Sequence, residues 1–195
     1  MNVQVVTAPT NEPVTLTEAK SHLRVDHEHE DTLIESLVTT ARQYAESVLT
    51  RRAFVTQTLQ VTLDEWPNDK LLLPRPPLQS VESITYYDED GVSDVVDAGD
   101  YIVDTSSEPG RIALKRNASW PSVTLRAVNG IEIEYIAGYG GAEDVPEEFK
   151  HGIKLIVGHW YNNREAIDLD AARGGVIEIP MGASALFGGH KVFLP

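Results

Sequence analysis

The sequence predicts an α+β protein: a mainly helical core of two N-terminal helices and one C-terminal helix, an inserted small antiparallel β region, and an extended C-terminal arm. Three observations predict it. Apolar residues recur at helical spacing near both ends, strand-like alternation lies between them, and no regular pattern continues beyond Arg164. The expected parts are the N-terminal helical part of the core at 1–52, the β region at 53–140, the C-terminal core helix at 141–165 and the arm at 166–195.

Two helices are expected in the first part. Thr15 can cap a short helix that ends near Arg24, and Glu18, three residues on, can complete a capping box. A longer helix follows, because apolar residues repeat at helical spacing for several turns. They are Leu33, Ile34, Leu37, Val38, Ala41, Tyr44, Ala45, Val48 and Leu49. Acidic residues at its start (Glu28, Glu30, Asp31) and basic ones at its end (Arg51, Arg52) favour the helix dipole.

The middle of the chain has the period of β-strands. Leu59, Val61 and Leu63 alternate with polar neighbours, as in a strand with one buried face. Further strand candidates are 81–87, 92–96, 101–103, 111–114 and 130–136, and turns such as Asp90-Gly91 separate them. Short strands joined by such turns predict a small antiparallel sheet or barrel.

Helical spacing returns near residue 147, where Asp144 is the expected cap and Pro146 fits the first turn. The expected buried stripe is Phe149, Ile153, Ile156, Val157 and Trp160. The remaining stretch is too long for a loop inside a compact domain, so we expect an arm whose apolar residues need another surface. These are Leu186, Phe187, Phe193 and Leu194. A frayed tail is the alternative. Deleting 174–195 is expected to leave a folded protein that assembles poorly.

Composition excludes several classes of protein. Cysteine is absent, which excludes disulfides, thiolate zinc sites and cysteine nucleophiles. The start has no secretory signal and no stretch approaches the roughly 20 apolar residues of a membrane span, so we expect a soluble protein made in the cytoplasm. The formal charge of -14 has the wrong sign for an electrostatic clamp on nucleic acid, which argues against a nucleic-acid-binding regulator.

Few groups of residues in the sequence could form a catalytic, metal-binding or phosphate-binding site. His27, His29 and Asp31 could in principle bind a divalent metal and support a metal-dependent hydrolase, but acidic residues at a helix start have an ordinary role there. Gly138-Tyr139-Gly140-Gly141 lacks the Lys-Ser/Thr of a phosphate loop, and no serine lies in a nucleophile motif. We therefore expect no enzyme, no cofactor and no metal.

The chain resembles the head–tail connector, or adaptor, family of tailed bacteriophages along nearly its whole length. Matching segments are 13–25, 30–31, 41–42, 45–46, 66–67, 73–78, 120–121, 135–140, 145–146 and 159–165. The resemblance implies a structural homo-oligomeric ring, a dodecamer in the virion neck, made in the host bacterial cytoplasm and assembled below the dodecameric portal. It implies contact with the portal and a tail-side stopper or tail-terminator protein, with DNA passing through the lumen and no membrane involved. Another joining protein, a stopper or tail-completion factor, is the nearest alternative.

Interface candidates are drawn from the end of the last helix and from the arm. They are Trp160, Tyr161, Arg164, Ile177, Ile179, Leu186, Phe187, Val192, Phe193 and Leu194. A second expectation concerns charge: carboxylates lining the lumen would let DNA slide without adhering.

Overall fold

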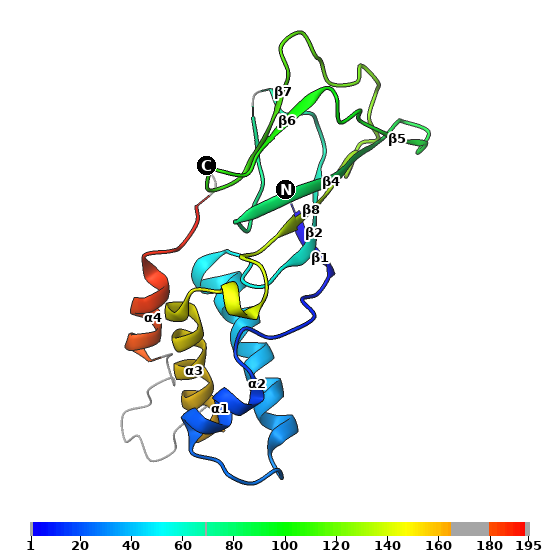
Figure 1. Ribbon diagram of the computed structural model, residues 1–195. Coiled ribbons are helices and arrows are strands. Elements are labelled where there is room, and N and C mark those ends of the chain that lie inside the picture. The colour runs from blue at the N-terminus through cyan, green and yellow to red at the C-terminus, as the bar shows by residue number, and fades with distance from the viewer. Residues whose placement is uncertain (1, 69, 165–179, 194–195) are drawn as a thin grey trace, which may run out of the picture.

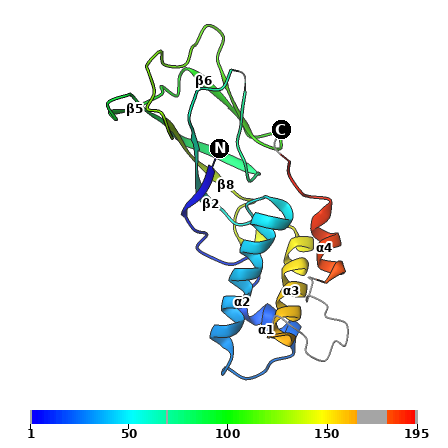
Figure 2. The same ribbon diagram turned by 180° about the vertical axis from the view of Figure 1, so that it is seen from behind.

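The computed structural model describes residues 2–68, 70–164 and 180–193. It confirms the α+β class. Helices gather at one end of an elongated molecule and strands at the other, so the helices lie beside the end of the β part and do not cover its broad faces (Figures 1 and 2).

The helical body consists of α1 (Leu16–Leu23), α2 (Asp31–Tyr44), α3 (Glu147–Asn162) and α4 (Met181–Gly188). The predicted capping box begins α1: the Glu18 N–H donates to the Thr15 hydroxyl at 3.2 Å, and the Thr15 N–H donates to the Glu18 carboxylate at 2.8 Å. Before α3, however, Asp144 ends the short 3-10 helix η2 (Ala142–Asp144), and Pro146 holds the N-cap position predicted for Asp144.

The long N-terminal helix changes form at its end. It continues from α2 into a π-helical segment, η1 (Ala45–Thr50), in which the Thr50 hydroxyl donates to the Ala45 carbonyl at 2.9 Å. The inward faces of these helices and of α3 build one hydrophobic core, which includes Ile34, Phe149 and Ile153.

The β part has two antiparallel sheets. One follows the order β1 (Asn2–Thr7), β2 (Gln57–Leu63), β8 (Ile131–Ala137), β4 (Leu78–Tyr87) and β5 (Ser93–Val95). The other follows β3 (Leu71–Leu72), β7 (Arg111–Leu114) and β6 (Tyr101–Asp104). Alternation along β8 buries Ile131, Ile133 and Tyr135 in a second core, to which Ile112 of β7 also contributes.

A buried polar network joins the two cores. Glu46 in η1 accepts hydrogen bonds from Arg42 at 2.7 Å, from the Phe54 N–H at 2.7 Å and from the Gln57 side chain at 2.9 Å. Burial raises the pKa of Glu46, although Arg42 opposes the shift. Because Phe54 belongs to the helical core and Gln57 begins β2, this carboxylate fixes one core against the other.

The predicted extended arm is wrong for the part of it that the structure describes. Residues 181–188 form α4, which packs against α3 and buries Ala183 and Phe187. Gly152 of α3 makes room for Phe187: a Cβ at that position would lie 2.5 Å from the ring. An eight-residue helix rich in small residues has no clear apolar stripe, which is why periodicity missed it. Periodicity also missed the edge strand β1.

Candidate interface surfaces

Two predicted interface residues, Trp160 and Tyr161, lie in the last turn of α3, and a third, Arg164, lies two residues beyond its end. All three already have contacts within the chain. Trp160 packs edge-on against Tyr44, with 6.1 Å between ring centroids. Tyr161 donates a hydrogen bond to Glu30, which also pairs with Arg164. The hydrogen bond from Tyr161 is the largest cause that lowers the pKa of Glu30 below its ordinary value, and the hydrogen bond from Arg164 is the next largest. This group therefore fastens the α3 end to the start of α2, while Arg164 remains exposed.

The predicted interface residues that follow α3 separate into three groups. Phe187 and Val192 are buried inside the chain and are not free to bind a partner, which corrects the expectation that they are exposed. Leu186 is half-buried, whereas Phe193 is 71% exposed. Ile177, Ile179 and Leu194 lie outside the described residues.

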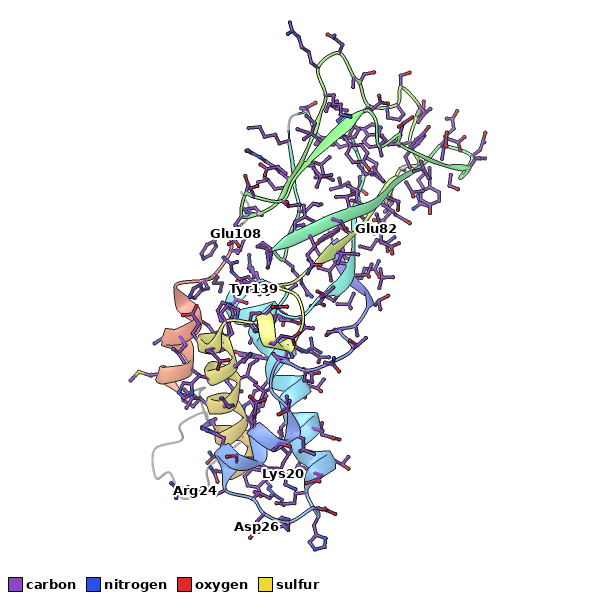
Figure 3. All side chains as sticks on the ribbon, in the orientation of Figure 1. Lys20, Arg24, Asp26, Glu82, Glu108 and Tyr139 are labelled. Atoms are coloured by element: carbon purple, nitrogen blue, oxygen red, sulfur yellow. The ribbon has the colours of Figure 1, made fainter. Side chains whose placement is uncertain are left out.

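Arg52 anchors the segment that leads to Phe193. Its guanidinium donates to the His190 carbonyl at 2.8 Å, pairs with Glu108 at 2.7 Å and donates to the Tyr139 hydroxyl at 3.3 Å. Glu108 follows β6 and Tyr139 follows β8 (Figure 3). Three regions of the chain therefore meet at the Arg52 side chain. The Val192 N–H adds a hydrogen bond to the Thr50 carbonyl at 2.9 Å. Phe193 is therefore presented from a fixed base.

The outer end of the β part exposes apolar residues that sequence reasoning did not single out. Val92, Val95, Ile102 and Val128 are each more than half exposed. Acidic residues flank Val92 in the sequence: Asp88, Glu89, Asp90 and Asp94. Apolar residues exposed singly at a surface are common, so these residues do not define a binding site by themselves.

The histidine and aspartate cluster at the start of α2 does not assemble as a metal site. His27 and His29 lie with 5.7 Å between ring centroids, but Asp31 is held by Lys20 at 2.6 Å. Across residues 2–68, 70–164 and 180–193, no three His, Asp or Glu side chains are grouped to hold a metal ion. In the same ranges, no helix combines the length and the hydropathy needed to cross a bilayer.

Comparisons with known proteins fit this architecture. A family model described as "Head completion protein" matches residues 12–183. No curated protein matches the chain. A chain of a structure titled "Neck of empty GTA particle computed with C6 symmetry" has a TM-score of 0.81 and 23% identity, covering 100% of this chain and 97% of that one.

Two further structures have the same coverage of both chains and 22% identity. They are titled "Virion of native gene transfer agent (GTA) particle", with a TM-score of 0.80, and "Neck of native GTA particle computed with C12 symmetry", with a TM-score of 0.78. At these identities the likeness is one of fold.

Proposed function

Because the chain belongs to the head completion protein family, we propose that it is a structural head–tail adaptor that forms a ring in the neck of a phage-like particle. The observation that carries this proposal is the family match over residues 12–183. The fold supports it, since matching chains come from neck structures computed with C6 and C12 symmetry. A ring of C12 symmetry would match a dodecameric portal on one side and a tail-side protein on the other.

The proposal assigns the chain no catalytic role. Asp31 of the predicted cluster is held by Lys20, and Glu30, which lies 4.0 Å from His27, is engaged by Tyr161 and Arg164. The strongly buried carboxylate Glu46 is surrounded by hydrogen-bond donors and serves the junction of the two cores. Each of these groups thus has a structural contact that accounts for it.

Phe193 is the arm residue that best fits contact with the portal or a neighbouring copy. It is a large exposed aromatic residue on a segment held by Arg52 and Thr50. Burying such a side chain at an interface contributes about 1.5–3 kcal/mol before ordering costs. A fixed base lowers those costs because the segment is already ordered.

The charge of -14 fits a passage for DNA that does not hold it. Carboxylates act on the duplex only within about 8 Å at physiological salt, so they must line the lumen to have this effect.

Native mass spectrometry of the purified protein, alone and with its cognate portal, tests the adaptor role. We expect a complex with a fixed number of copies on the portal, weakened by Phe193→Ala. A protein that stays monomeric at every concentration and does not bind the portal would contradict the proposal.

A further inference from the structure

An uncharged face runs along the outward side of the long N-terminal helix. In α2 and η1, exposed positions recur at helical spacing opposite the buried residues Ile34, Val38 and Ala41. Glu35 flanks these positions and Arg51 follows them, so charge is confined to the border of the face. We call the exposed positions the α2 face; they are Thr32, Ser36, Thr40, Gln43 and Ser47.

Two hydroxyl groups of the α2 face are already satisfied within the helix. The Thr40 hydroxyl donates to the Ser36 carbonyl at 2.8 Å, and the Ser47 hydroxyl donates to the Gln43 carbonyl at 2.6 Å. A polar group that keeps its hydrogen bond loses little when water is removed from it. Covering this face therefore costs less free energy than covering a row of carboxylates or ammonium groups.

The uncharged surface continues from the α2 face onto the N-terminal strand. Residues 2–11 contain no charged side chain, and Val5 and Val6 of β1 are 44% and 50% exposed. Both valines line a hollow of about 450 Å³ together with Gln43 and Ser47. Strand β1 and helix α2 accordingly lie on the same side of the molecule (Figures 1 and 2).

The charged residues that reach this hollow balance one another. Arg42 and Glu46 line it, but they are 5% and 2% exposed and pair with each other at 2.7 Å. Arg42 also pairs with Glu12. Half-buried Arg75 lines the hollow too, and its charge acts on Glu46. Two arginines thus stand against two carboxylates in formal charge.

A second uncharged surface lies on the opposite side of the helical body. Residues 180–189, which include α4, contain no charged side chain, and Met181 at the start of α4 is 87% exposed. Ser184 is exposed as well, whereas Ala183 and Phe187 are buried. Helices α2 and α4 both pack against α3, from its two sides (Figures 1 and 2).

A ring of identical copies needs two different surfaces on each copy, one for each neighbour. Each copy of this chain has a formal charge of -14, so carboxylates brought together across a contact would repel one another. Uncharged surfaces on opposite sides of the helical body avoid that repulsion. Residues 31–50 of α2 and η1 rise by about 30 Å, and a standard interface of about 800 Å² per partner is about 28 Å on a side. The α2 face therefore has the length of a stable contact.

We propose that α4 of one copy packs on the α2 face of the next copy in the ring. Exposed apolar side chains lie on both sides of this contact: Met181 on α4, and Leu33, Val5 and Val6 beside the α2 face. The proposal rests on the ring assembly proposed above and identifies the two surfaces that form it.

Cross-linking of single-cysteine chains tests the contact, and the absence of native cysteine leaves one reactive thiol on each chain. Full-length Ser36→Cys and Ser184→Cys chains with tags of different mass are mixed, assembled with the cognate portal and treated with a short bismaleimide. We expect heterodimers to form roughly tenfold faster than from Ser21→Cys and Ser184→Cys, because the contact raises the effective thiol concentration. Ser21 is the matched control, an exposed serine of α1 outside both surfaces.

Two results of this experiment would overturn the proposal. Equal rates for the two mixtures would show that α4 is not closer to the α2 face than to α1 of a neighbour. Homodimers of Ser36→Cys that form as fast as the heterodimers would show that two α2 faces meet each other, which is a different contact.

Added charge provides a second readout. Ser36→Glu should raise the concentration needed for ring assembly, measured by native mass spectrometry, roughly tenfold, because it puts a carboxylate inside a contact between acidic copies. Adding Ser184→Lys should restore assembly, whereas Ser21→Glu should leave it unchanged. Circular dichroism checks that each variant is folded. Unchanged assembly of folded Ser36→Glu would also overturn the proposal.

The outcomes separate this contact from the adaptor role. If rings form on the portal while neither the cross-linking nor the added charge gives the expected difference, the contact assignment fails and the adaptor role stands. If no complex forms with the portal, the adaptor role fails and the contact fails with it.

Discussion

Replacing Phe187 by alanine tests whether the C-terminal helix is part of the core. The Phe187 side chain is 1% exposed and stacks near Phe149 and Phe54, with ring centroids 6.0 and 6.3 Å away. Gly152, which lies against the ring, has no side chain that could fill the space. Loss of transfer free energy and creation of a cavity together predict a loss of about 3–5 kcal/mol in the free energy of unfolding.

The matched control is Phe193→Ala, which removes the same side chain six residues further on. Because Phe193 is 71% exposed, its loss should change stability by less than about 0.5 kcal/mol. Urea denaturation followed by circular dichroism measures both variants. Equal losses, or a loss below about 1 kcal/mol for Phe187→Ala, would refute the packing described here. By the same reasoning, deleting 174–195 should destabilise the helical core, to which Ala183 and Phe187 belong, contrary to the expectation from sequence.

Three further predictions concern the junction, a turn and a loop. Glu46→Ala should lower the free energy of unfolding by about 3 kcal/mol, since it leaves Arg42 buried with a partner missing; denaturant unfolding measures this, and a neutral effect would contradict the network. Gly138→Ala should lower the melting temperature, because φ is +128° and a Cβ would lie 2.6 Å from the backbone; an unchanged melting temperature would contradict it. The Asp104 carboxyl has its pKa lowered from 3.8 to about 2 by hydrogen bonds from Ser107 and Arg111, so its contribution to stability is present above about pH 4 and is lost as the pH falls towards 2. Titration by NMR should show Arg111→Ala raising that pKa, and an unmoved pKa would contradict the assignment.

Much of the fold could be predicted because its elements carry strong local signals. The Thr15 and Glu18 capping box and the apolar stripe of α3 depend on residues within a few turns of one another. The expectation of a connector family, formed from segments spread along the chain, is confirmed by the match over residues 12–183.

The missed elements depend on distant partners. Strand β1 is stabilised by β2, more than 50 residues later, and α4 by a space that Gly152 opens on α3. Nothing within α4 marks its buried face. The one local signal is Gly152 beside the predicted stripe of α3, since a glycine in a helix permits a large side chain to approach closely. The interface prediction for Phe187 was wrong for the same reason. From the sequence alone, no covering surface for Phe187 can be identified, because its neighbours in space are distant along the chain.

Electron cryomicroscopy of the particle that this chain helps to build tests the adaptor role. We expect a closed ring of copies between the portal and the first tail-side protein, with each helical body and β part fitting the density and a passage for DNA along the axis. A neck reconstruction in which that position is filled by a different protein, with this chain absent, would contradict it.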